Sequence, residues 1–231
     1  MIPTPESASR PMRTAAEVHR PLRLGVLLSG KGRGSNMANL VAATRDGRLH
    51  GNVVLVVSTA RGAPALERAA ALDVPTRLIP ADEYPDPLAL DRALADALAE
   101  AGVDLVCLCG YMRLLGPEFL ARFPDRVLNV HPSLLPRFGG KGFYGRRVHE
   151  AVIAAGARES GASVHLVDGE YDHGPVLMQE IVPVRPDDTP DTLAERVLAA
   201  EHRIYPEAIR RYVASGYQVP PQPWIARTVE R

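Results

Sequence analysis

The sequence predicts one α/β domain, built on an open, twisted, mainly parallel sheet with helices on both faces. Short apolar runs of strand length alternate with longer amphipathic stretches, which is typical of a parallel sheet covered on both sides. The 231 residues, 46% of them hydrophobic and 23% charged, are ordinary for one well-buried globular domain. Near the C-terminus, two more strands joined by a short loop predict an antiparallel addition to the sheet.

The strands of the parallel part share a run of aliphatic residues ended by polar or turn residues. They are expected at 22–29, 52–58, 75–80, 103–109 and 126–131. The helices between them share an apolar stripe at helical spacing. They are expected at 35–46, 63–72, 87–101 and 117–123.

The regular alternation of predicted strands and helices ends after residue 136. A glycine-rich, basic loop at 139–147 leads into a helix at 146–155, and two strands are then expected. Thr189 is a suitable N-cap residue and Pro190 suits the first helical position, so a last helix is expected after them. The expected elements of this part are strands at 162–167 and 176–184 and a helix at 189–214.

The composition limits the compartment and the partners. Residues 1–21 lack the apolar core of a secretory signal and are expected to be a disordered extension to a domain over 22–215, with a proline-rich tail at 216–231. A net charge of zero gives no electrostatic case for nucleic acid or a membrane surface. Cys107 and Cys109 lie in an apolar strand and indicate buried free thiols. We therefore expect a cytoplasmic monomer or homodimer that acts on small molecules.

A glycine-rich turn, "SGKGRGSN", follows the first strand. Gly30, Gly32 and Gly34 allow a tight turn, and Ser35 or Asn36 opens a helix whose free N–H groups attract phosphate. The spacing fits neither the Gly-Lys-Ser/Thr of a Walker loop nor a dinucleotide fingerprint with its later acidic residue. We interpret the turn as a site for a single phosphate, with a plain glycine turn as the alternative.

Polar residues gather at the end of the fifth strand. Asn129 and His131 are two positions apart, so they project from one face at the end where open α/β sheets bind ligands. An asparagine amide can stabilise an oxyanion, by about 3–4 kcal/mol in favourable cases, and a histidine can act as an acid or a base. Asp172, in a glycine-flanked loop, is either the carboxylate partner of His131 or a turn former, and His165 either faces the site or packs in the core. No histidine and cysteine spacing typical of a metal site occurs, so no metal is expected.

The ordered set of segments resembles the phosphoribosylglycinamide formyltransferase family of purine biosynthesis over roughly residues 22–214. The matching segments are "GSN" of the glycine loop, "GYMRLL" at 110–115, "NVHPSLLPRF" at 129–138, "GASVHLVD" at 161–168, "DHGP" at 172–175 and "AEHRIYP" at 200–206. The resemblance implies a Rossmann-like formyltransferase fold. It also implies transfer of a formyl group from 10-formyltetrahydrofolate, as co-substrate, to the amine of glycinamide ribonucleotide.

The resemblance assigns roles to individual residues. It implies that Asn129 and His131 stabilise the oxyanion, that His131 and Asp172 manage the amine proton, and that His165 is an accessory residue. For the folate it implies contacts with Met112, Arg113, Leu114, Leu115 and Asp172, and for the amine substrate and its phosphate contacts with Gly34, Ser35, Asn36 and Glu201.

Three departures from the family pattern lie on the amine side. The phosphate loop is two residues longer than usual, "RFGGKGFYGRRVHE" replaces the common segment after "HPSLLP", and Leu198 stands where many members carry Lys or Gln. The loop cations Arg137, Lys141, Arg146 and Arg147 either hold an anionic substrate or the folate glutamate tail, or are only solvated.

Other folate enzymes with this catalytic core are the alternatives. A formyltetrahydrofolate deformylase uses water as acceptor, but usually carries "HHS" and an N-terminal regulatory domain, for which 21 residues are too few. Formyltransferases acting on methionyl-tRNA or sugar nucleotides usually carry a C-terminal module. A non-enzymatic binding protein is disfavoured by the presence of all three catalytic residues.

Overall fold

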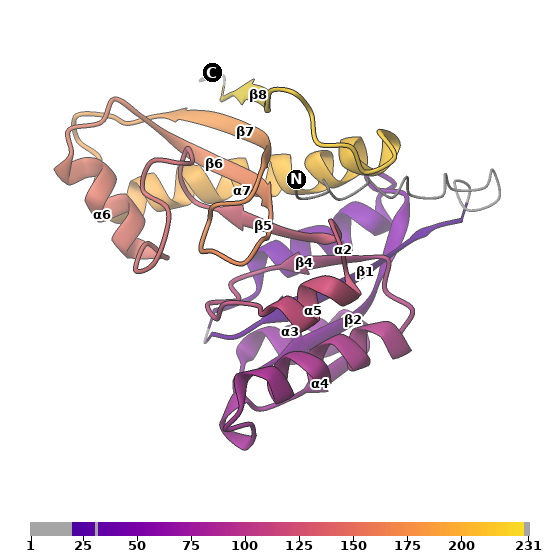
Figure 1. Ribbon diagram of the computed structural model, residues 1–231. Coiled ribbons are helices and arrows are strands. Elements are labelled where there is room, and N and C mark those ends of the chain that lie inside the picture. Colours follow the sequence, from indigo (N-terminus) through magenta and orange to yellow (C-terminus); the bar gives the residue numbers. More distant parts are fainter. Residues whose placement is uncertain (1–19, 31, 229–231) are drawn as a thin grey trace, which may run out of the picture.

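The computed structural model describes residues 20–30 and 32–228. They form an eight-stranded sheet in the order β3-β2-β1-β4-β5-β6-β7-β8, with helices on both faces (Figure 1). Residues 1–19 of the expected N-terminal extension lie outside the described residues.

The first half of the sheet is parallel. Its strands, from the edge inward, are β3 (Thr76–Leu78), β2 (Gly51–Ser58), β1 (Leu22–Leu28), β4 (Leu105–Leu108) and β5 (Val127–His131). The helices that connect them are α2 (Ser35–Arg45), α3 (Pro64–Ala71), α4 (Pro87–Glu100) and α5 (Pro117–Arg122). This is the alternation that the apolar runs predict.

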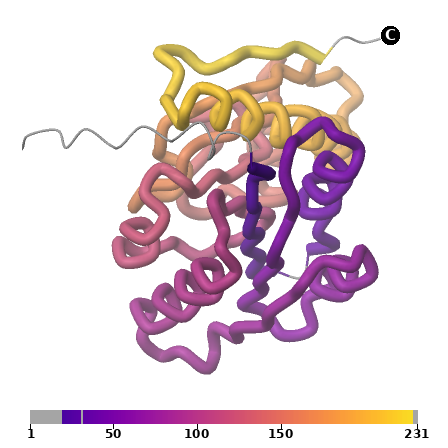
Figure 2. The backbone as a smooth tube through the Cα atoms, turned by 90° about the vertical axis from the view of Figure 1, so that its right-hand side faces the viewer, coloured from indigo at the N-terminus to yellow at the C-terminus, as the bar shows by residue number. Residues whose placement is uncertain are grey.

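The second half begins where the sheet changes direction. β6 (Glu159–Leu166) runs antiparallel to β5, β7 (Val176–Pro183) runs antiparallel to β6, and β8 (Trp224–Arg227) lies parallel to β7. α6 (Arg146–Ala154) precedes these strands, and α7 (Pro190–Ala214) runs along them, as Figure 2 shows from the side. A capping box between Thr189 and Thr192 begins α7 at the residue that the sequence predicts.

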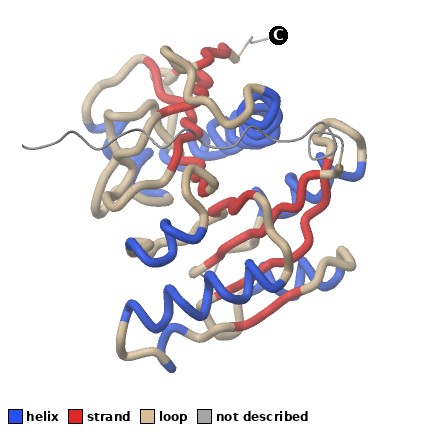
Figure 3. Tube along the Cα trace, turned by 45° about the vertical axis from the view of Figure 1, so that its right-hand side comes forward, coloured by secondary structure: helices blue, strands red, loops and turns tan. Residues whose placement is uncertain are grey.

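Two apolar layers cover the sheet. One lies under α4 and α5, and the other lies under α2, α3, α6 and α7, so the sheet is sandwiched between helices (Figure 3). The fully buried Tyr205 of α7 ties the second layer to the sheet, because its hydroxyl group lies 3.1 Å from Leu108 O and 2.9 Å from Leu128 O. These carbonyl oxygens belong to β4 and β5, next to the ends of both strands.

The predicted fold class is confirmed: the sheet is open and mainly parallel, helices cover both faces, and antiparallel strands are added near the C-terminus. Two predicted strands are longer than the observed ones, since β3 covers only 76–78 and β4 begins at 105. β8 lies inside the segment that was expected to be only a proline-rich tail. Four residues, of which Trp224 and Ala226 are half-buried and the other two exposed, are too few to show a clear period in sequence, and this strand forms by pairing with the edge of β7. No described helix is both long and apolar enough to cross a membrane.

Candidate active site

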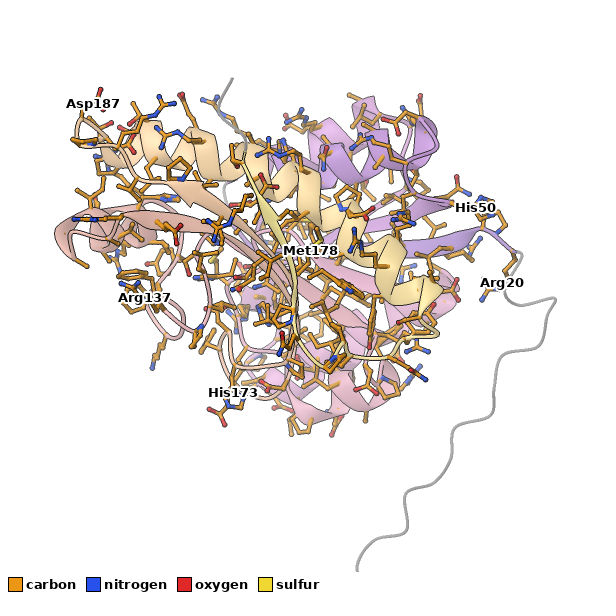
Figure 4. All side chains as sticks on the ribbon, turned by 90° about the horizontal axis from the view of Figure 1, so that it is seen from above. Arg20, His50, Arg137, His173, Met178 and Asp187 are labelled. Carbon is orange, nitrogen blue, oxygen red and sulfur yellow. The ribbon has the colours of Figure 1, made fainter. Side chains whose placement is uncertain are left out.

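The polar cluster lies where the sheet changes from parallel to antiparallel. Asn129 and His131 are at the C-terminal end of β5, and Asn129 is directly opposite His165 in the β5–β6 register. The loops that follow β5 and β6 lie on the same side of the molecule, where Arg137 and His173 mark them in Figure 4. Two neighbouring strands and two loops therefore supply one site, and its place matches the ligand-binding end of α/β sheets.

Asp172 is brought to both predicted catalytic residues. It lies in the loop after β6 with a left-handed backbone (φ 54°). Its Oδ2 lies 3.4 Å from His131 Nδ1 and accepts the N–H of Gly140 at 3.0 Å. Its Oδ1 lies 3.4 Å from Asn129 Nδ2 and 3.6 Å from His165 Nε2. One carboxylate thus faces all three polar side chains of the cluster.

The His131 ring is held from both sides. Its Nε2 lies 2.8 Å from the carbonyl oxygen of Phe138, and because a carbonyl only accepts, this nitrogen carries a hydrogen. Its Nδ1 faces the Asp172 carboxylate, which is also only an acceptor when ionised. Both ring nitrogens of His131 therefore face oxygen acceptors.

The electrostatics of Asp172 agree with this arrangement. Burial of the carboxyl group raises its pKa, but the hydrogen bond from His131, the His131 charge and the Gly140 N–H act in the opposite direction. Their sum holds the pKa of Asp172 well below its usual range. Asp172 is accordingly a carboxylate at neutral pH and can hold a positively charged partner.

His165 orients the Asn129 amide. It is 2% exposed, and its Nδ1–H donates to Leu166 O at 2.7 Å, which leaves Nε2 as an acceptor for Asn129 Nδ2 at 3.0 Å. The second amide hydrogen points at Asp172 Oδ1 across a long, weak 3.4 Å contact. This second hydrogen is the one that can turn to a ligand oxygen.

Tyr111 and Tyr171 line three cavities, and Asn129 and Asp172 line two of them. The slot is a narrow cavity between the YMRLL segment (residues 111–115) and two members of the predicted catalytic trio, which is Asn129, His131 and Asp172. Asn129 and Asp172 line the slot, and Leu108, Leu115 and Val167 give it apolar walls. The main cavity, about 570 Å³, opens on the His131 side under the 139–147 loop. The side cavity, about 320 Å³, lies between that segment and the start of α4.

The predicted folate residues divide between these cavities. Arg113, Leu114, Leu115 and Asp172 line the slot, whereas Met112 lines the main cavity and the side cavity. Met112 and Leu114 are about half exposed, and Leu115 is buried.

The predicted phosphate residues form a second group. Gly34 is the N-cap of α2 with φ +67°, and a Cβ placed there would lie 2.8 Å from Ala65 Cβ, so a glycine is needed. The first turn of α2 holds no acidic residue. Asn36 Nδ2 donates to Glu201 Oε2 at 2.6 Å, which links this turn to α7. Gly34, Ser35, Asn36 and Glu201 are not among the residues that line the slot, the main cavity or the side cavity.

Glu201 is 8% exposed. Burial raises its pKa to about 7, although the Asn36 hydrogen bond and the His131 charge both lower it. Glu201 is therefore a buried carboxyl group that Asn36 links to the predicted phosphate turn.

Two of the four loop cations face the main cavity. Lys141 and Arg147 line it, and the Arg147 guanidinium lies 5.0 Å from the Tyr144 ring centre. Arg146 instead pairs with Glu150 and Asp191, and Arg137 lies over the ring of Phe138.

Sequence reasoning missed several contributors. The Phe138 carbonyl and Gly140 N–H act through the backbone, which no residue type reveals. Tyr111 and Tyr171 were not singled out, although Tyr111 begins the YMRLL segment. His149 is 4% exposed, and burial together with the His131 charge lowers its pKa to about 4. Within residues 20–30 and 32–228, no three His, Cys, Asp or Glu side chains are grouped to hold a metal ion.

Comparisons with known proteins agree with this architecture. The family model described as "Formyl transferase" matches residues 22–209. The chain is 40% identical to the chloroplastic phosphoribosylglycinamide formyltransferase of Arabidopsis thaliana, over 90% of this chain and 73% of the relative. It is similar to the solved structure of glycinamide ribonucleotide transformylase 1 from Symbiobacterium toebii (TM-score 0.80, 41% identity, 91% of this chain and 95% of that one). A second similar structure is phosphoribosylglycinamide formyltransferase from Coxiella burnetii (TM-score 0.77, 38% identity, 85% of this chain and 89% of that one).

Proposed function

Because the chain belongs to the formyl transferase family, we propose that it transfers the formyl group of 10-formyltetrahydrofolate to the amine of glycinamide ribonucleotide. The observation that carries the proposal is the Asp172 carboxylate, which faces both His131 and Asn129 beside an apolar slot. The names of the relatives support this acceptor, since they are phosphoribosylglycinamide formyltransferases over most of this chain.

The lining of the slot suits the ring of a reduced folate, and the slot, about 40 Å³, has to widen to admit it. Leu108, Leu115 and Val167 supply flat apolar walls, and Asn129 and Asp172 supply polar groups at one end. In this position Arg113, Leu114, Leu115 and Asp172 contact the folate, with Met112 at the boundary of the main cavity. The bound folate supplies an activated formyl group.

Asn129, His131 and Asp172 then stabilise the developing charge and hold the proton that is transferred. As the amine attacks the formyl carbon, the developing negative charge on the formyl oxygen is stabilised by the second Asn129 N–H and by His131. One N–C bond forms, the bond from the formyl carbon to N10 of the folate breaks, the amine loses one proton and N10 gains one. The ionised Asp172 holds His131 in its charged form and accepts from it, so the proton stays at the reacting centre.

The amine substrate occupies the His131 side. The free N–H groups of Gly34, Ser35 and Asn36 bind its phosphate at the start of α2. Glu201, fixed by Asn36, contacts the ribose or glycinamide end.

The proposed place of the reaction is the cytoplasm, with small-molecule substrates and a monomeric or homodimeric enzyme. Cys107 and Cys109 are buried free thiols, which suits a reducing compartment. The Arabidopsis relative is named chloroplastic, so a compartment assay with a tagged chain is the direct measurement.

The reaction is tested by following absorbance as purified protein converts 10-formyltetrahydrofolate to tetrahydrofolate. We expect turnover with glycinamide ribonucleotide and none without it. Turnover that needs no amine would replace the proposal with a deformylase. Turnover only with a different amine would correct the acceptor.

A further inference from the structure

The buried hydroxyl group of Tyr111, near the site, takes no part in the mechanism above. Tyr111 is 7% exposed, yet its hydroxyl oxygen is buried and has no hydrogen-bond partner among the described residues. Burial raises the pKa of Tyr111, so the hydroxyl keeps its hydrogen and can donate as well as accept. A buried hydroxyl group without a partner is destabilising, and such groups are rare unless a ligand or water completes them.

The position of Tyr111 points to a ligand. It lines the slot beside Asn129 and Asp172, and it also lines the side cavity beside Asp91 and Arg113. A folate whose ring fills the slot must leave it past the reacting centre, where N10 carries the formyl group. Tyr111 stands at this exit, between the trio and the side cavity.

The protein groups near the hydroxyl do not satisfy it. Asp91 is 4% exposed, and its Oδ2 accepts the N–H of Gly116 at 2.7 Å. Its charge interacts with the Tyr111 hydroxyl, as does that of Arg113, but no hydrogen bond between these groups is formed. A ligand group that approaches the buried hydroxyl displaces no hydrogen bond to a described protein group.

We propose that Tyr111 is a specificity-determining residue whose hydroxyl group hydrogen-bonds a polar group of the reduced folate where it passes from the slot towards the side cavity. The inference rests on the proposed function, because it takes the formyl donor as the occupant of the slot. Tyr111 takes no part in the chemical step. It contributes to the affinity for the donor and not to the affinity for the amine.

The test is Tyr111→Phe, which removes only the hydroxyl group. Tetrahydrofolate binding is measured by calorimetric titration without any amine, and KM and kcat are measured with 10-formyltetrahydrofolate and glycinamide ribonucleotide. Loss of one neutral hydrogen bond is expected to weaken tetrahydrofolate binding about three- to tenfold and to raise the donor KM by a similar factor. The amine KM and kcat are expected to stay unchanged.

Thermal stability separates this role from a structural one. Removing a hydroxyl group that has no protein partner should leave the Tm of the free protein unchanged or raise it. The matched control is Tyr205→Phe, whose hydroxyl is bonded to carbonyl oxygens of β4 and β5, so that its Tm should fall while tetrahydrofolate binding is retained.

Two results would overturn the inference. Equal tetrahydrofolate affinity in wild type and Tyr111→Phe would show that the hydroxyl does not contact the folate. A fall in Tm like that of Tyr205→Phe, with unchanged affinity, would assign it a structural role. If the wild-type protein does not bind tetrahydrofolate, the donor assignment itself fails, which is a different result from either.

Discussion

At the scale of single residues, the site depends on how Asp172 is held. Its carboxylate is buried, which alone would favour the neutral form, but His131 and one backbone N–H reverse that preference. Oδ2 faces His131, and Oδ1 faces Asn129 and His165. The same carboxylate therefore stabilises a charge and orients two side chains.

Asp172→Asn tests whether the carboxylate both stabilises a charge and orients its neighbouring side chains. The amide keeps the size of the side chain but removes the charge that holds the His131 proton, so we expect kcat to fall by roughly 100-fold or more. Circular dichroism should show the same fold. Activity close to that of wild type would remove Asp172 from the mechanism.

Glu201 gives a prediction with a defined pH range. Its pKa in the folded protein, about 7, is above the ordinary value of 4.5 for an exposed glutamate, so its protonated form stabilises the fold. That stabilisation is complete below pH 4.5 and is lost as the pH rises through about 7. Glu201→Gln keeps a neutral side chain at every pH. Relative to this variant, the free energy of unfolding of wild type should fall by about 3 kcal/mol between pH 4.5 and about 8.5.

Urea unfolding at a series of pH values measures this difference. Glu195→Gln is the matched control, because Glu195 lies on the same helix and is exposed. Its curve should stay parallel to that of wild type. A Glu201→Gln curve that also runs parallel would show that Glu201 does not titrate as described.

At the scale of elements, the segment 139–147, which runs into the first turn of α6, supplies the positively charged side chains that line the main cavity. Lys141 and Arg147 line this cavity together with His131, whereas Arg146, the first residue of α6, is paired with carboxylates on α6 and α7. Arg113, Leu114 and Leu115, the proposed folate residues, line the slot instead. Lys141 and Arg147 are therefore placed to attract the phosphate-bearing amine.

A double variant, Lys141→Ala with Arg147→Ala, should raise the KM for glycinamide ribonucleotide about three- to tenfold with little change in kcat. Exposed charges are screened, so the effect should shrink as salt is added. Arg146→Ala is the control and should leave this KM unchanged. A rise in the KM for the folate alone would assign the cations to the glutamate tail.

At the scale of the whole molecule, the sheet ends in a short strand that covers a charged group. β8 pairs with β7, and the nearly buried Glu180 of β7 accepts from Arg203 Nε at 3.0 Å and from the Thr228 hydroxyl at 2.7 Å. β8 is separated from β5, which carries Asn129 and His131, by two strands. Its contribution is therefore expected to be to stability and not to catalysis.

Ending the chain at residue 222 removes β8 and Thr228. This exposes the edge of β7 and one side of Glu180, so we expect the Tm to fall by several degrees, since about 1 kcal/mol shifts the Tm of a domain of this size by about 2–4 °C. Activity at 25 °C should be retained. Ending the chain at residue 228 is the control that keeps β8, and an equal Tm for both truncations would contradict the prediction.

The parts of the structure that could be predicted are those determined by the spacing of apolar and polar residues close together in the sequence. Alternating apolar runs gave the parallel half of the sheet, and two-residue spacing placed Asn129 and His131 on one face. The approach of Asp172 depends on a left-handed loop residue and on the β5–β6 pairing, which are non-local. The division of the YMRLL segment between cavities and the unpartnered Tyr111 hydroxyl depend on side-chain packing across elements, which one sequence does not reveal.

The hydrogen bonds that the loop after β5 makes to His131 and Asp172 come from its main chain, at the Phe138 carbonyl and the Gly140 N–H. Gly139 and Gly140 are constrained, because a Cβ on Gly139 would lie 2.4 Å from Leu135 Cδ2 and Gly140 has φ +94°. Mutations that change the other side chains of the loop can therefore alter the preferred acceptor while leaving the formyl-transfer chemistry in place. Insertions or deletions within 138–140 would disturb both hydrogen bonds at once. Diversification of this enzyme, in nature or in a directed-evolution library, should thus tolerate side-chain replacement in the loop outside these two glycines far better than a change in its length between 138 and 140.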